Sequence, residues 1–78
     1  MNDFIKIRIT SPEDLLHLHS IMVTYKGDFT VEMGNVCVDG KSLVGLMAFS
    51  QNEAEIHTTL QDADLELFKI AIKNMIID

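Results

Sequence analysis

The sequence contains one cysteine, one proline and no tryptophan, and its apolar residues never form a long uninterrupted run. A single thiol, Cys37, excludes an internal disulfide bond. No run approaches the roughly 20 apolar residues of a membrane span, so we expect no membrane insertion. The N-terminus has neither the basic start nor the apolar core of a signal peptide, and a cytoplasmic location is the simplest expectation.

Basic residues are also scarce. Six lysines and arginines stand against twelve acidic residues, which gives a formal net charge of −6. Binding of nucleic acid requires clustered positive charge that replaces counterions, whereas the basic residues here are scattered. We therefore expect protein partners and no nucleic acid, and we assign no cofactor.

The composition is that of a folded chain. Hydrophobic residues make up 47% of the sequence, and no segment is polar and biased enough to be disordered. We find no linker and no internal repeat. Residues 1–78 are therefore predicted to form a single small domain.

Alternation of apolar and polar residues predicts four strands, over residues 3–9, 29–33, 36–38 and 54–60. The turn at residues 34–35, Gly-Asn, joins the second and third strands into an antiparallel hairpin. Each strand is apolar on one side only. That pattern is typical of a sheet whose single apolar face is covered by helices.

Three helices are predicted between and after these strands. The first begins after Ser11 and runs to about Tyr25, and the second is a short helix after Ser42. The third begins near Asp62 and extends to the C-terminus. The resulting order is β-α-β-β-α-β-α, which predicts an α+β open-faced sandwich.

The segment around Ser42 is unusually apolar for its length. Its candidate partner-binding residues are Lys41, Leu43, Val44, Leu46, Met47 and Phe49. So many apolar side chains on so short an element cannot all face inward, and exposed apolar patches commonly mark partner sites. The alternative is an entirely buried helix in which Gly45 permits close packing.

Residues 41–47, Lys-Ser-Leu-x-Gly-Leu-Met, resemble the regulatory serine segment of HPr, the histidine phosphocarrier of bacterial sugar phosphotransferase systems. The order of the predicted elements is also that of this family. The resemblance implies a four-stranded antiparallel sheet with three helices on one face. It also implies that Ser42 is phosphorylated by a dedicated kinase and that the product binds a transcriptional regulator. The alternative is that Ser42 only caps a helix.

The chemistry of that family is carried by a Gly-[Ile/Leu]-His-Ala-Arg-Pro-Ala segment at the start of the first helix. The corresponding window, residues 10–15, contains neither histidine nor arginine. Glu13 and Asp14 instead place two carboxylates where a phosphoryl group would be bound by helix amides. We therefore expect no catalytic residues and no phosphoryl transfer. Because phosphoryl transfer is the activity of the family, whether the chain is an enzyme stays an open question.

His17 and His19 are the alternative phosphate acceptors. Both lie within the predicted first helix, where the backbone amides are already bonded. They are separated by about 200° around the helix axis, so we expect no shared metal and assign no metal ligands. We expect structural or solvated roles for both. The same expectation covers His57, Cys37, Glu53 and Glu55 on the polar sides of strands.

The leading hypothesis is an HPr-like regulatory or protein-interaction module that docks partners through the Ser42 helix. Its partners would be phosphotransferase-system proteins, a serine kinase or a transcriptional regulator. One alternative is a non-standard phosphocarrier that uses His17 or His19. Another is an HPr-fold homodimer or complex subunit unrelated to sugar transport.

Overall fold

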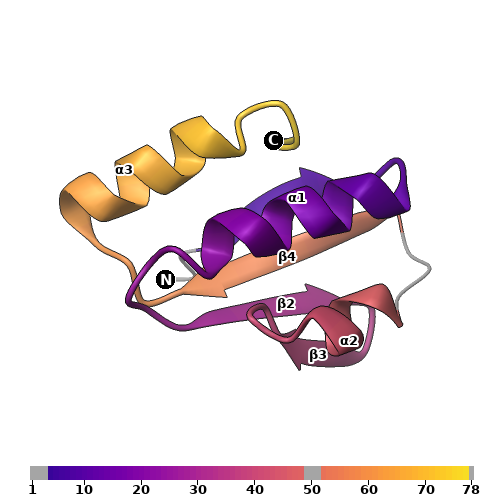
Figure 1. Cartoon of the computed structure of the whole chain (residues 1–78). Helices are drawn as coiled ribbons and strands as arrows, with labels where there is room; N and C mark the ends of the chain where they lie inside the picture. The colour runs from indigo at the N-terminus through magenta and orange to yellow at the C-terminus, as the bar shows by residue number, and fades with distance from the viewer. Residues whose placement is uncertain (1–3, 49–51, 78) are drawn as a thin grey trace.

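The computed structural model describes residues 4–48 and 52–77, and it has the predicted order of elements (Figure 1). Within these ranges no helix is long and apolar enough to cross a membrane. The elements are β1 (Phe4–Arg8), α1 (Pro12–Met22), β2 (Phe29–Met33), β3 (Val36–Asp39), α2 (Leu43–Met47), β4 (Glu53–Thr58) and α3 (Asp62–Ala71).

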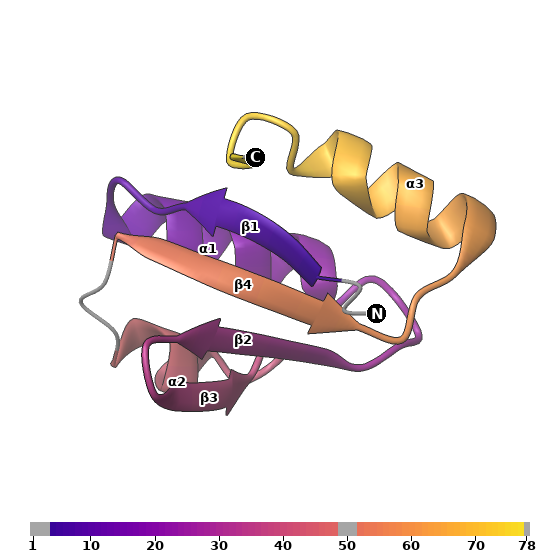
Figure 2. The ribbon, with the colours of Figure 1, turned by 180° about the vertical axis from the view of Figure 1, so that it is seen from behind.

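The sheet has four strands in the order β1-β4-β2-β3, and every neighbouring pair is antiparallel. The last strand in the sequence, β4, therefore lies between β1 and β2. Figure 2 shows the sheet in front of α1 and α2, which both lie on its far side. The predicted α+β open-faced sandwich with a four-stranded antiparallel sheet is confirmed.

The core lies between the sheet and the helices and consists of apolar side chains. Within the described ranges no polar or charged residue is buried. Ile56 of β4 is paired with Ile5 on one side and Val31 on the other, so the three strands present apolar side chains to the same layer. From α3, Phe68 enters this layer, and its ring centroid lies 5.0 Å from that of Phe29.

The first helix ends earlier than the sequence predicts, at Met22 rather than near Tyr25. The Thr24 hydroxyl donates to the carbonyl of Ile21 at 2.7 Å, and the Thr24 amide donates to the same oxygen at 3.1 Å. These bonds span three residues and close the last turn, so the helix does not continue. Tyr25 still packs against the core from the loop, 5.8 Å from the Phe68 ring.

The third helix also ends early, at Ala71 rather than at the C-terminus. After Ile72 the chain turns and runs back along β1, where Ile76 forms a bridge with Ile7. The backbone amide of Arg8 donates to the carbonyl oxygen of Met75 at 2.8 Å, and the backbone amide of Ile77 donates to the carbonyl oxygen of Lys6 at 2.8 Å. The tail thus satisfies backbone groups on the outer edge of β1, which a continued helix could not reach.

Truncation of Phe68 should test whether α3 is part of the core. Phe68→Ala should lower the free energy of unfolding by about 3–5 kcal/mol, because a fully buried aromatic ring is lost. Its neighbour Leu67, which is 56% exposed, provides the control. Leu67→Ala should cost less than about 1 kcal/mol in urea unfolding. Equal losses would show that α3 does not pack as described.

Candidate functional site

Ser42 caps α2 as the sequence predicts. Its side-chain oxygen accepts a hydrogen bond from the Gly45 amide at 3.3 Å, and the residue is exposed. The preceding residue, Lys41, is held in place, since its Nζ donates to the Tyr25 carbonyl at 2.6 Å and lies 5.9 Å from the centre of the Phe29 ring. The beginning of α2 is therefore tied to the loop that follows α1.

The apolar residues of α2 divide between the core and the surface. Leu46 is fully buried and Leu43 is half-buried, whereas Val44 is 84% and Met47 is 42% exposed. The alternative of an entirely buried helix is therefore wrong. Phe49, the remaining candidate, lies outside the described residues. We call the exposed pair, Val44 and Met47, the α2 surface.

The neighbouring helix also carries exposed apolar side chains. Leu16 on α1 is 45% exposed, and Val23, which directly follows the last residue of this helix, is 48% exposed. Figure 1 shows α1 and α2 over the same face of the sheet, and the two helices contact each other. The helical side of the molecule therefore presents apolar groups from two adjacent elements.

The two candidate histidines have different surroundings. The Nε2 atom of His19 lies 3.1 Å from the Lys41 carbonyl oxygen, so His19 links the end of α1 to the start of α2. His17 is exposed and lines a surface hollow of about 350 Å³ together with Arg8 and Asp14. His19 therefore has a structural contact of its own.

A carboxylate occupies the N-terminus of α1. Asp14 accepts hydrogen bonds from the backbone amide and from the hydroxyl of Thr10, both at 2.7 Å. These two bonds lower the pKa of Asp14 below its ordinary value of 3.8, and the nearby His17 adds a smaller effect in the same direction. The anion-binding end of this helix thus already holds a negative charge from the chain itself.

The polar face of the sheet brings together a cluster that the sequence analysis did not predict. His57 on β4 lies with its Nε2 atom 3.2 Å from Oε1 of Glu32 on β2 and 3.7 Å from Oε1 of Glu55. All three side chains are half-buried. Glu55 therefore belongs to a contact cluster and is not merely solvated charge, and His57, for which a structural or solvated role was expected, has two side-chain contacts. Alternation along β4 predicts that Glu55 and His57 share one face of the sheet. It does not predict that Glu32 of β2 lies opposite Glu55.

The cysteine lies on this same face. Cys37 of β3 is paired with Glu32 and is exposed. Partial desolvation raises the pKa of the Cys37 thiol, and the charge of Glu32 and a hydrogen bond to it act in the same direction. A thiol in this environment is less available as a thiolate than a free cysteine.

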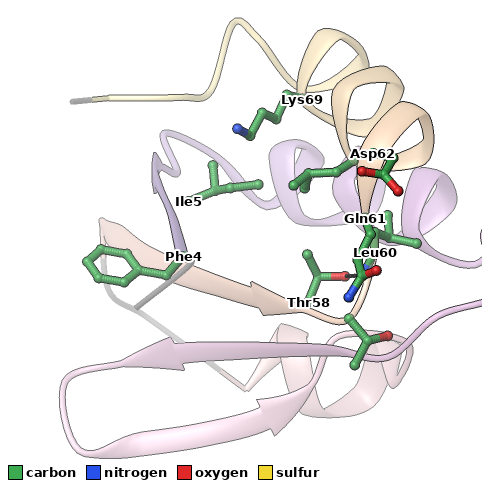
Figure 3. A pocket seen from close by; sticks show the side chains of 9 residues that line it. Phe4, Ile5, Thr58, Leu60, Gln61, Asp62 and Lys69 are labelled. Atoms are coloured by element: carbon green, nitrogen blue, oxygen red, sulfur yellow. Dashed lines mark hydrogen bonds between the residues drawn. The ribbon is translucent and has the colours of Figure 1, made fainter. Parts of the chain in front are cut away.

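A further hollow of about 450 Å³ lies between the start of β1 and the start of α3 (Figure 3). Its wall combines the apolar side chains of Phe4, Ile5 and Leu65 with the polar groups of Asp62 and Lys69. Of the predicted site residues that the structure describes, none lines it.

Comparison with known proteins gives no match for this chain among protein-family models, curated proteins or solved structures.

The charge of Asp14 should make a pH-dependent contribution to stability. Its folded-state pKa is lowered, so the carboxylate stabilises the fold above its ordinary pKa of 3.8 and loses this effect as the pH falls through the folded-state value. Asp14→Asn should lower the free energy of unfolding by roughly 0.5–1 kcal/mol at neutral pH, because the bonds to Thr10 are exposed to solvent.

Urea unfolding at a series of pH values measures this contribution. The difference between Asp14→Asn and the unchanged chain should disappear in acid, and Glu13→Gln is the matched control at the adjacent position. A difference of the same size at every pH would contradict the assigned role of the carboxylate.

Proposed function

We propose that this chain is a regulatory protein-interaction module, similar in role to HPr-like proteins that do not carry phosphate, and that it binds its partner through the α2 surface. The observation that carries this proposal is the exposure of Val44 and Met47, 84% and 42%, on a helix whose Leu46 is fully buried. Methionine suits such a surface because its flexible thioether adapts to different partners.

The helix that carries the α2 surface is anchored to the rest of the fold. Its start is held by two hydrogen bonds, from the Gly45 amide to the Ser42 hydroxyl and from the Lys41 side chain to the Tyr25 carbonyl. Its inner side is held by the buried side chain of Leu46. A surface fixed in advance loses little conformational entropy on binding. This supports a docking function for an element of only five residues.

The partner should present an apolar pocket surrounded by basic groups. The chain has a net charge of −6, so a basic rim would favour encounter and correct orientation. The resemblance of residues 41–47 to the HPr regulatory segment names candidate partners, which are a phosphotransferase-system protein, the family's serine kinase and its transcriptional regulator.

Phosphorylation of Ser42 would regulate this docking. The hydroxyl is exposed and directly precedes the first residue of α2. A phosphate there adds about −1.5 to −2 charges beside the α2 surface. The carboxylate of Asp39, which accepts from the Lys41 amide at 3.0 Å, lies close in the chain and would disfavour the added charge. Phosphorylation would therefore change the partner preference of the surface.

Phosphoryl transfer is not part of this proposal. The N-terminus of α1, where the family holds its phosphohistidine, is occupied by the carboxylate of Asp14. No contact described here favours a displaced acceptor at His17 or His19, and the His19 ring is engaged with the Lys41 carbonyl. A homodimer through the α2 surface is distinguished from partner binding by light scattering.

A charge placed on the α2 surface should weaken docking. Val44→Glu should reduce affinity at least about tenfold for whichever of enzyme I, the serine kinase and the regulator binds the unchanged chain, because it puts a charge into an apolar contact. Ile70→Glu, at a site on α3 that is 62% exposed, should leave binding unchanged. Titration calorimetry with the purified proteins measures the affinity of each variant. Binding of none of the three proteins, or equal losses in both variants, would overturn the proposal.

The regulatory serine can be tested by intact-protein mass spectrometry. Incubation with ATP and the serine kinase should add one phosphate to the unchanged chain and none to Ser42→Ala. Incubation with phosphoenolpyruvate and enzyme I should add none. Phosphate transferred from enzyme I would contradict the proposal and would direct attention to His17 and His19.

A further inference from the structure

The polar face of the sheet carries three side chains that converge on one point. We call Glu32, Glu55 and His57 the open-face triad, and each offers one ligand atom within 4.8 Å of the other two. The triad lies across the sheet from the core, while α1 and α2 cover the core side (Figure 2). Any ligand bound there leaves the α2 surface free.

The backbone beneath the triad is well supported. Glu32 and Glu55 are directly paired across β2 and β4, which are the two inner strands of the sheet. His57 lies two residues along β4 and therefore on the same face as Glu55. The three side chains are between 35% and 39% exposed, so they are accessible from solvent yet partly ordered by their neighbours.

The two separations from His57 suit a tetrahedral metal ion. Zinc binds histidine nitrogen and carboxylate oxygen at distances near 2.0–2.2 Å, which places neighbouring ligand atoms about 3.3–3.5 Å apart. The Nε2 atom of His57 lies 3.2 Å from Glu32 and 3.7 Å from Glu55, on either side of that value. The two carboxylate oxygens lie within 4.8 Å of each other, so rotations of these half-buried side chains would bring all three atoms into one coordination sphere and leave a fourth position for solvent.

The arrangement of charge independently favours a cation. Glu32 and Glu55 are direct cross-strand partners, and like charges in that position destabilise a sheet. Lys6 is paired with Glu55 on the other side, which places one positive group on the same face. A divalent ion between the two carboxylates would remove the remaining repulsion.

We propose that the open-face triad binds a divalent transition-metal ion of the zinc type. One imidazole nitrogen and two carboxylate oxygens form a donor set that such ions accept. Calcium and magnesium require six or more oxygen ligands and fit this small mixed set poorly. The competing explanation is that protonated His57 bridges the two glutamates as an ion pair.

Calorimetric titration of the full chain with zinc chloride tests the site. We expect one ion per chain and an affinity that falls at least about tenfold in His57→Gln and in Glu32→Gln, since loss of even an outer partner of a metal ligand commonly costs that much. Glu53→Gln is the matched control, because Glu53 lies on the same strand but pairs with Arg8 at 3.5 Å. His17→Gln controls for binding at the other exposed histidine. Both controls should bind zinc like the unchanged chain.

Two further measurements keep the result interpretable. Zinc should raise the melting temperature of the unchanged chain and of Glu53→Gln but not of His57→Gln, which also shows that each variant folds. Cobalt should give the visible absorption bands of a four-coordinate site, lost in His57→Gln. Unchanged affinity in His57→Gln, or no binding by the unchanged chain, would overturn the proposal and leave the ion pair. Val44→Glu should bind zinc with the same affinity as the unchanged chain. The metal site is therefore tested separately from the proposed docking function.

Discussion

The structure depends on the register of β4 between β1 and β2. The pairing of Ile56 with Ile5 and Val31 places three apolar side chains in one buried layer. Side chains alternate along a strand, so the same register puts Glu55 between Lys6 and Glu32 on the opposite face. A shift of one residue would exchange the two faces of β4, burying its charged residues and exposing its apolar ones.

A one-sided sheet also limits what the helices can bury. The core takes Leu46 from α2, while Val44 and Met47 of this short helix remain outside. The apolar surface of α2 is therefore a consequence of helix length, since five residues cannot turn every side chain toward the sheet. Because the cap at Ser42 fixes this helix, its exposed side chains have a defined position. The proposed docking on the helical side and the proposed metal binding on the open side would thus use opposite faces of one sheet.

Local patterns in the sequence predict much of this fold. Strict alternation identifies the strands, the Gly34-Asn35 turn identifies the hairpin, and the capping role of Ser42 follows from its place before an apolar run. The ends of α1 and α3 could not be predicted in the same way. They depend on the bonds of Thr24 to Ile21 and on pairing of the C-terminal tail with β1, and the tail pairing joins parts of the chain far apart in sequence.

The candidate sites also differ in how far they can be predicted, because one is set by local sequence and the other by contacts between distant segments. The exposure of the α2 surface is predictable because it arises within one short segment, whereas the open-face triad requires the pairing of Glu32 with Glu55 across β2 and β4. Composition and periodicity place each of these residues on a polar face but do not state which lie opposite one another. The resemblance to HPr adds a hypothesis about regulation through Ser42, and that regulation stays a prediction.

A map of cross-strand contacts by nuclear magnetic resonance tests the register most directly. Backbone contacts are expected between Glu55 and both Lys6 and Glu32, and between Ile56 and both Ile5 and Val31. Contacts that pair Glu32 with Ala54 or Ile56 would contradict this register. Such a slipped register would separate the open-face triad and place charged side chains of β4 against the helices.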